Sequence, residues 1–318
     1  MSAPALCYVV GTGRSGSTLV GNILGELPGV FCAGELRFLW ERGFVENRYC
    51  GCGARFGDCP FWTEVVTRAG LTSDPARLAA VSNDVVRIRR VGSWLRGGTT
   101  VDPAVRDLAE HHRRVNLAIA ATSGSTVVVD TSKSPAFALV LEAAGIRPAS
   151  YLHLVRDPRA AAWSWSRQAP SRAPAGDTEP MDRFPPAKSA ALWLFWNSIA
   201  ARRFDGRERT CLARYEDFVA RPRTEMERIV AGLGFDPGAL SCFDDESTVR
   251  LSANHTVAGN PGRRSSGPST IVDDDEWRAA MPSRDRAAVT TIALPLLHRF
   301  GYRAGGAPAV PAPVGGLR

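Results

Sequence analysis

Long apolar runs and basic segments are both absent from this sequence of 318 residues. No stretch reaches the roughly eighteen apolar residues that a membrane-spanning helix needs. No basic region precedes the first apolar run, at residues 6–10, so the sequence predicts no signal peptide. Without a long Lys/Arg run, or a basic stripe interleaved with aromatic residues, it also indicates no nucleic-acid partner.

An even set of cysteines is lacking too. The seven cysteines are an odd number for a chain of this size, which favours the reducing cytoplasm over an oxidising compartment. What is present is an ordinary globular composition, 44% hydrophobic and 22% charged, rich in Ala and Arg as in GC-rich bacterial sources. Lys and Arg outnumber Asp and Glu by 39 to 32, and the resulting net charge of +7 suits an anionic small ligand.

Apolar runs of strand length alternate with segments of helical periodicity along most of the chain. The predicted strands are residues 6–10, 30–32, 126–129, 151–155 and 210–213. The predicted helices are residues 18–27, 135–144, 159–167, 187–204 and 223–233. This alternation predicts a single α/β domain over residues 1–304, with a central parallel sheet flanked by helices. Composition predicts loops at 169–186 and 254–269 and a disordered tail at 305–318.

Three glycines stand between the first predicted strand and the first predicted helix, in the segment Gly11-Thr-Gly-Arg-Ser-Gly-Ser-Thr18. Glycine lets backbone N–H groups approach an anion, and a helix N-terminus adds the positive end of its dipole. The segment therefore predicts a phosphate-binding loop, against the alternative of a plain strand-to-helix turn.

Two known phosphate-binding patterns fit this loop to different degrees. As a Walker A loop it has the right spacing, but Ser17 stands in place of the lysine that reaches the β- and γ-phosphates, which disfavours ATP or GTP hydrolysis. As a dinucleotide fingerprint, Gly11, Gly13 and Gly16 fit fully, and Glu35 could bind a ribose. A Rossmann-type dinucleotide-binding oxidoreductase is therefore the alternative function.

A second candidate anchor lies at the end of the strand at 151–155. Arg156 follows this strand and Ser164 stands eight residues later, so a helix starting after Asp157 would turn both toward the carboxyl edge of the sheet. Asp157 before Pro158 is also a good helix N-cap with proline at the first helical position. An anion site and a capped helix are compatible with each other here.

Three closely spaced cysteines, Cys50, Cys52 and Cys59, lack the two C-x-x-C pairs of a zinc ribbon. His111 or His112 could complete a four-ligand site, but nothing in the spacing requires it. We therefore predict a structural loop and no metal site, with a disulfide or an adventitiously bound metal as the alternatives.

Together these segments resemble the start and the centre of the sulfotransferases that use 3′-phosphoadenosine-5′-phosphosulfate (PAPS). The resemblance rests on Gly13-Arg-Ser-Gly-Ser-Thr-Leu19, Gly34-Glu-Leu-Arg37 and Arg156-Asp-Pro-Arg-Ala, and the tyrosylprotein and carbohydrate branches are nearest. It covers about residues 5–40, 126–168 and 210–220 well. It implies a sulfotransferase fold like that of the P-loop kinases, PAPS as the sulfuryl donor and no metal.

The resemblance also implies roles for individual residues. It assigns the 5′-phosphosulfate to a set of loop residues: Arg14, Ser15, Gly16, Ser17 and Thr18. It assigns the 3′-phosphate and its surroundings to a second set: Arg156, Ser164, Tyr215 and either Arg263 or Arg264. Lys133 and Arg14 would stabilise charge on the sulfuryl group and leaving phosphate. Glu35, twenty-one residues after Arg14, would be the catalytic base.

Each of these assignments has a plainer alternative. Lys133 could be a surface charge at a strand end, Tyr215 a packing residue, Arg263 and Arg264 solvated loop charges, and Glu35 a glutamate favoured by a helix dipole. A nucleotide kinase and a non-catalytic nucleotide-binding module remain alternative functions.

The acceptor is predicted only as a class: the hydroxyl of a small molecule, a carbohydrate or a lipid-linked group. Aromatic residues in or beside predicted helices are expected to be core, with one or two lining an apolar acceptor pocket. They are Trp163, Trp165, Trp193, Phe195 and Trp196.

Overall fold

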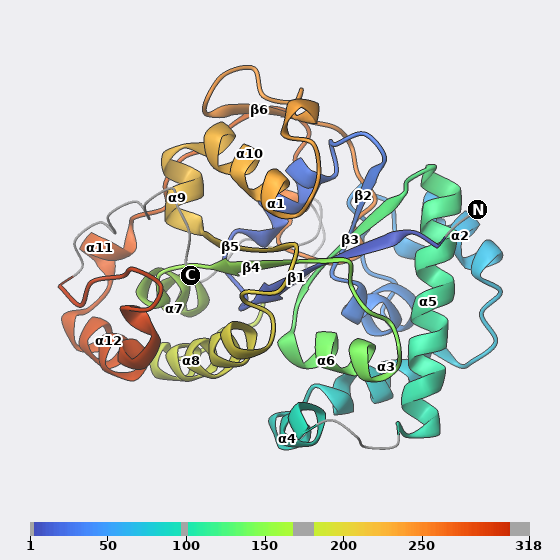
Figure 1. The fold of residues 1–318 in the computed structure, drawn as a ribbon, viewed down its shortest axis with the longest axis horizontal. Coiled ribbons are helices and arrows are strands. Elements are labelled where there is room, and N and C mark those ends of the chain that lie inside the picture. The colour runs from blue at the N-terminus through green and yellow to red at the C-terminus, as the bar shows by residue number, and fades with distance from the viewer. Residues whose placement is uncertain (1–2, 97–100, 168–180, 306–318) are drawn as a thin grey trace.

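The computed structural model describes residues 3–96, 101–167 and 181–305. Five parallel strands form a central sheet in the order β2-β3-β1-β4-β5 (Figure 1). Their bounds are β1 Ala5–Gly11, β2 Val30–Gly34, β3 Val127–Lys133, β4 Ser150–Val155 and β5 Thr210–Arg214. Each predicted strand overlaps one of these. The predicted loop at 169–186 falls outside the described residues up to 180, and the predicted tail falls outside them from 306 onward.

The α-helices follow the strands or fill the segments between them. They are α1 Ser17–Leu24, α2 Pro60–Ala69, α3 Pro75–Val85, α4 Ile88–Arg96, α5 Pro103–Ser123, α6 Pro135–Ala143, α7 Pro158–Ser166, α8 Pro186–Arg203, α9 Tyr215–Ala220, α10 Pro222–Gly232, α11 Trp277–Ala280 and α12 Ser283–Leu297. Four 3₁₀-helices are described: η1 Leu36–Phe38, η3 Phe56–Asp58, η4 Pro237–Ala239 and η5 Pro261–Arg264. The segment η2 Leu39–Val45 is a π-helix. Two further strands, β6 Thr248–Leu251 and β7 Gly267–Thr270, form an antiparallel pair.

Alternating side chains of β1 explain why helices cover both faces of the sheet. Leu6, Tyr8 and Val10 belong to one core cluster, which also contains buried residues of α5, α6 and α8. Cys7 and Val9 belong to another, with buried residues of α1 and α10. Side chains alternate across a strand, so a central strand that is apolar throughout must be covered on both sides. Figure 1 shows α1 and α10 on one side of the sheet and α6 and α8 on the other.

The strand order distinguishes between the two folds that the loop sequence fits, the P-loop fold and the dinucleotide-binding fold. In the common dinucleotide-binding order, 3-2-1-4-5-6, the second strand lies beside the first. Here β3 lies between β1 and β2. The glycine pattern that fits a dinucleotide fingerprint therefore occurs in a sheet of a different topology, which argues against the oxidoreductase alternative.

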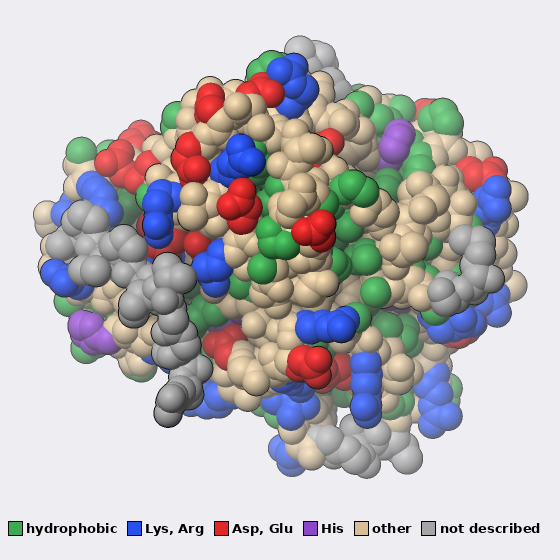
Figure 2. Space-filling model, turned by 45° about the horizontal axis from the view of Figure 1, so that its top comes forward, with side chains coloured by type: hydrophobic (Ala, Val, Ile, Leu, Met, Phe, Trp, Pro, Cys, Tyr) green, Lys and Arg blue, Asp and Glu red, His purple; other side chains and the backbone are tan. Residues whose placement is uncertain are grey.

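The surface charge is mixed rather than gathered. Acidic and basic side chains lie interspersed on the face drawn in Figure 2. Among the residues that the structure describes, none of the helices combines the length and the apolar character needed to cross a membrane.

Candidate active site

The predicted phosphate loop joins β1 to α1 at the middle strand of the sheet (Figure 1). Gly16 has a φ of +85°, and a Cβ atom there would lie 2.4 Å from the ring of Tyr215. A Cβ atom at Gly13 would lie 2.5 Å from the ring of Trp165. Both positions therefore require glycine. The turn places Ser17 and Thr18 in the first turn of α1, where backbone N–H groups have no partner within the helix.

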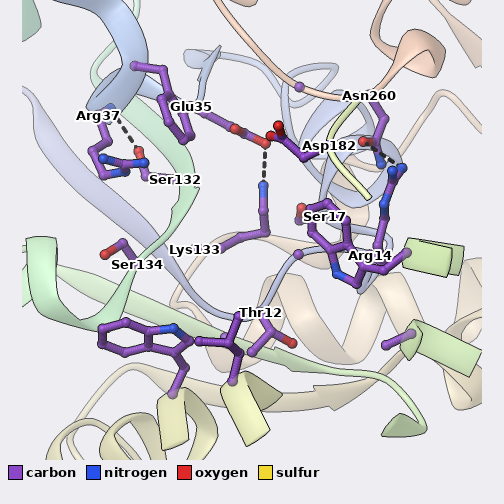
Figure 3. A pocket seen from close by; sticks show the side chains of 18 of the residues that line it. Thr12, Arg14, Ser17, Glu35, Arg37, Ser132, Lys133, Ser134, Asp182 and Asn260 are labelled. Carbon is purple, nitrogen blue, oxygen red and sulfur yellow. Dashed lines mark hydrogen bonds and ion pairs between the residues drawn. The ribbon is translucent and has the colours of Figure 1, made fainter. Parts of the chain in front are cut away.

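Glu35 and Lys133 meet at the carboxyl ends of two neighbouring strands, β2 and β3 (Figure 3). Lys133 Nζ donates to Glu35 Oε1, and also to the carbonyl oxygen of Thr131 at 3.0 Å. Arg42 Nη1 lies 3.7 Å from Glu35 Oε2. The Lys133 and Glu35 side chains are only 12% and 10% exposed. Lys133 is thus not a surface charge: it is the last residue of β3, and Glu35 lies between two cations.

Arg14 extends from the phosphate loop into a cavity that Glu35 and Lys133 also line. Its Nη1 donates to Asn260 Oδ1 at 3.3 Å (Figure 3). Its guanidinium lies 4.6 Å from the centre of the Trp165 ring. The backbone N–H of Asn260 also lies 3.4 Å from Thr18 Oγ1. The loop before η5 therefore contacts the phosphate loop through Asn260.

Arg156 lies directly after β4, on the other side of the phosphate loop from β3. It donates to the carbonyl oxygen of Arg14 at 3.3 Å, and its guanidinium lies 4.3 Å from the centre of the Tyr215 ring. Its Nη2 donates to the backbone oxygen of Asp274 at 3.0 Å and to its carboxylate at 3.2 Å. A buried guanidinium at this sheet edge thus has one acidic partner that an anionic ligand could replace.

The remaining predicted anchors differ in their surroundings. Ser164 is half-buried on α7, and Asp157 caps that helix by accepting from the N–H of Arg159 at 2.9 Å, as predicted. Arg263 is buried, with its guanidinium donating to the carbonyl oxygens of Gly259 and Tyr49. Arg264, its neighbour, is half-buried.

Asp130 is a supporting residue that the sequence analysis misses. It is fully buried on β3, and its Oδ1 accepts from the backbone N–H groups of Leu36 at 3.3 Å and Ser132 at 2.8 Å. Burial raises the pKa of Asp130 to about 7. It ties the turn after Glu35 to the end of β3. A polar residue directly after a buried apolar run, three before Lys133, is the signal that could have identified it.

The cavity between these side chains has a volume of about 460 Å³. It is lined by Arg14, Ser17, Glu35 and Lys133, so the structure brings these four predicted residues together (Figure 3). Of the five aromatic residues considered above, three line it, namely Trp165, Trp193 and Trp196. Trp163 and Phe195 pack against the core instead. Arg42 also lines the cavity, but no pattern in the sequence singles it out.

The cysteine segment acquires a histidine that its own spacing does not indicate. His255 Nδ1 lies 3.3 Å from Cys59 Sγ and 3.8 Å from Cys50 Sγ. The two histidines considered from the sequence lie elsewhere. His111 accepts from the backbone of the segment before α3, and His112 is buried beside Asp130.

Comparisons with known proteins give one relative in sequence and several in structure. No protein-family model matches the chain. The chain is similar to the nodulation protein NoeE of Sinorhizobium fredii (strain NBRC 101917 / NGR234), with 26% identity over 323 aligned positions that cover 94% of this chain. The chain spans 66% of the length of NoeE.

Among solved structures, the chain is similar to the sulfotransferase domain from the curacin biosynthetic pathway. The TM-score is 0.50 at 16% identity, and the match covers 95% of this chain and 99% of that domain. It is also similar to sulfotransferase STF9 from Mycobacterium avium, with a TM-score of 0.48 at 12% identity and coverage of 95% and 78%. The match to the curacin domain spans nearly all of both chains and confirms the predicted fold class. The chain therefore has the sulfotransferase fold.

Proposed function

We propose that this protein transfers a sulfuryl group from PAPS to an acceptor hydroxyl. One observation carries the proposal: the Glu35–Lys133 ion pair and Arg14 line one cavity at the mouth of a phosphate loop. The ends of three adjacent strands, β2, β3 and β1, supply this arrangement. The sulfotransferase fold and the similarity to NoeE support it.

The residues around the loop fit an anionic donor. Ser15 is 1% exposed, and its hydroxyl has no hydrogen-bond partner among the described residues. A buried polar group without a partner is costly, and an oxygen of the 5′-phosphosulfate would satisfy it. We assign the 5′ end to the loop residues Ser15, Gly16, Ser17 and Thr18. The loop carries Ser17 at the position of the Walker lysine, so its grip relies on backbone N–H groups and hydroxyls.

We place the 3′-phosphate of the donor at the junction between β4 and α7. Arg156 Nε is buried and has no partner among the described residues, although its Nη atoms bind carbonyl oxygens and Asp274. A guanidinium fork suits a phosphate bidentately. We assign the 3′-phosphate to Arg156, with Ser164, Tyr215 and Arg264 around it.

In the proposed reaction the acceptor oxygen forms a bond to sulfur in line with the breaking bond between sulfur and the 5′-phosphate oxygen. The hydroxyl proton passes to the Glu35 carboxylate, which Lys133 holds in an ion pair. Lys133 and Arg14 stabilise negative charge on the sulfuryl oxygens and on the leaving phosphate. Adenosine 3′,5′-bisphosphate and the sulfated acceptor are the products.

The acceptor enters a cavity with a mixed wall. Trp165, Trp196 and Phe184 line it beside the charged residues, so it suits an acceptor with an apolar or ring face next to its hydroxyl. Small molecules, carbohydrates and lipid-linked sugars include such acceptors. None of the seven cysteines forms a disulfide, and we propose a reducing cytoplasm as the place of action.

A thermal-shift panel tests the donor assignment with four ligands: adenosine 3′,5′-bisphosphate, AMP, NADP⁺ and ATP with Mg²⁺. We expect the bisphosphate to give the largest rise in melting temperature, without added Mg²⁺. A larger shift with ATP–Mg²⁺ would indicate a kinase, and one with NADP⁺ an oxidoreductase. Binding of the bisphosphate without turnover of PAPS over a panel of hydroxyl acceptors would indicate a binding module.

A further inference from the structure

We propose that Cys50, Cys52, Cys59 and His255 form a structural Zn²⁺ site that fixes the loop 254–264. Three of these residues lie close in sequence, before and after η3, while the fourth comes from the segment that follows β6. The fold, rather than the spacing, brings the fourth ligand to the other three. The site is separate from the cavity proposed for catalysis, since none of its four residues lines that cavity.

The distances between the four ligand atoms fit a tetrahedron around one ion. Cys59 Sγ lies 3.6 Å from Cys50 Sγ and 3.7 Å from Cys52 Sγ. His255 Nδ1 lies 3.3 and 3.8 Å from Cys59 Sγ and Cys50 Sγ, and all four atoms lie within 4.8 Å of one another. Zn–S bonds of about 2.3 Å and Zn–N bonds of about 2.0 Å give tetrahedral edges of about 3.8 Å for S···S and 3.5 Å for S···N.

The ligand set selects the metal. Three thiolates and one imidazole in a tetrahedron are typical of structural zinc, whereas magnesium and calcium prefer six or more oxygen ligands. A disulfide would bring two sulfur atoms to about 2.05 Å, but all seven cysteines are free. Four protein ligands close the coordination sphere and leave no position for a substrate, so the ion would stabilise structure.

Groups around the ligands hold them in place from both segments. The Trp62 indole N–H donates to the carbonyl oxygen of His255 at 2.8 Å, and the Phe61 ring stacks on the imidazole with 4.9 Å between ring centres. Between the first two cysteines, the N–H of Gly51 donates to the carbonyl oxygen of Thr256 at 2.9 Å. Outer contacts of this kind fix the orientation of metal-binding side chains.

The packing at Gly51 also shows how closely the two segments approach. A Cβ atom at Gly51 would lie 2.1 Å from Asn254 Oδ1, so only glycine fits between Cys50 and Cys52. The loop then continues from His255 to Asn260, which contacts Arg14 and Thr18 of the phosphate loop. An ion at this place would therefore anchor the loop that covers the phosphate-binding turn.

The test measures zinc in the untagged full-length protein, purified with a phosphine reductant and freed of loose metal by gel filtration. We expect about one zinc per chain. Cys52→Ser and His255→Ala should each weaken zinc binding by more than about 100-fold, since losing even an outer partner of a zinc ligand costs 10–100-fold. Cys52 is exposed, so its replacement leaves the core packing intact.

Matched controls keep the result interpretable. Cys242→Ser and His298→Ala change the same residue types outside the cluster and should keep the full zinc content. His255→Cys retains four zinc-binding ligands and should also keep it. Cobalt substitution should give a thiolate-to-cobalt charge-transfer band that weakens in Cys52→Ser. A wild-type protein without zinc, or full zinc content in either Cys52→Ser or His255→Ala, would overturn the proposed four-ligand site.

Discussion

At the scale of single residues, Glu35 combines contacts from three elements. It follows β2, its partner Lys133 ends β3, and its second cation, Arg42, lies on η2. A glutamate placed only to favour a helix dipole would not need these partners. Two cations keep one carboxylate oriented in the cavity, which is what a positioned proton acceptor requires.

We therefore expect Glu35→Gln to reduce turnover of PAPS by about 10²–10⁴-fold, because the amide cannot accept the acceptor proton. Its binding of adenosine 3′,5′-bisphosphate, measured by calorimetry, should stay within about threefold of wild type. Glu41→Gln is a matched control, since Glu41 also lines the cavity but accepts from Asn83 rather than from Lys133. Wild-type turnover in Glu35→Gln would place the base elsewhere.

Asp130 gives a residue-scale prediction about pH. Its pKa is raised to about 7 in the folded protein, chiefly by burial, from an ordinary value of 3.8. Between these values the folded state binds a proton that the unfolded state has lost. The contribution to stability is therefore full below about pH 4 and is lost as pH rises toward 7, at about 1.4 kcal/mol per pH unit.

Asp130→Asn should remove this slope while keeping an acceptor for the N–H groups of Leu36 and Ser132. Denaturant unfolding of both proteins between pH 5 and 6.5 measures the difference in their free energies of unfolding. We expect the wild type to lose stability relative to the variant across this range. Parallel curves for the two proteins would show that the Asp130 carboxyl is ionised throughout.

At the scale of elements, the strands and the residues that directly follow them are the parts that the sequence predicts best. The apolar runs identify all five strands of the central sheet, of which β4 is buried along its whole length, and Asp157 with Pro158 marks the start of α7. The predicted helix at 18–27 is too long: α1 ends at Leu24, and Gly25 begins a turn. Periodicity alone continues past that point because Leu27 is also buried.

Arg156 is the element-scale test of the β4–α7 junction. Arg156→Ala should weaken binding of adenosine 3′,5′-bisphosphate at least about tenfold, because a charge-assisted contact to phosphate contributes about 1.5–3 kcal/mol. Binding of AMP, which has no 3′-phosphate, should change much less. Equal losses for both nucleotides in calorimetry would refute a role at the 3′-phosphate.

Asp274, in the segment between β7 and α11, leads to a prediction of opposite sign, because removing its charge should tighten ligand binding. Asp274 forms an ion pair with Arg156, so a 3′-phosphate bound there would compete with its carboxylate. Asp274→Asn should tighten the bisphosphate by about fivefold, as expected for a partly exposed ion pair of about 1 kcal/mol, and leave AMP unchanged. Asp275→Asn removes the same charge one residue away and serves as control. Weaker bisphosphate binding in Asp274→Asn would show that Asp274 supports the site.

At the scale of the whole molecule, what the sequence could not predict lies between β2 and β3 and also after α10, where β6, β7, α11 and α12 have no predicted counterpart. The described residues between 35 and 126 form η1 to η3 and α2 to α5, and no sequence pattern predicts a helix there. Their partners are distant: Arg42 meets Lys133 through Glu35, and Cys59 meets His255. Such contacts depend on how the insertion packs, and local periodicity contains no information about that packing.

The C-terminal limit of the domain, predicted at residue 304, depends on contacts between distant parts of the chain. Tyr302 is buried, and its hydroxyl donates to Glu216 Oε2 at 2.8 Å. Two residues later, the carbonyl oxygen of Ala304 accepts from Arg159 at 3.0 Å. The last contacts that fix the chain to the core among the described residues therefore lie at 302–304, directly before the segment that composition predicts to be disordered.

Two truncations test this limit. Deleting residues 306–318 should leave the midpoint of thermal unfolding within about 1 °C, because we expect that segment to bury no apolar surface. Deleting residues 302–318 should lower it by roughly 5–10 °C. Losing a buried aromatic side chain costs about 3–5 kcal/mol, and each kcal/mol lowers the midpoint by about 2 °C in a chain of this length. Tyr302→Phe, which removes only the hydroxyl, should fall between the two in calorimetry. If the shorter deletion destabilises the protein as much as the longer one, residues 306–318 belong to the folded domain and the predicted limit at 304 is wrong.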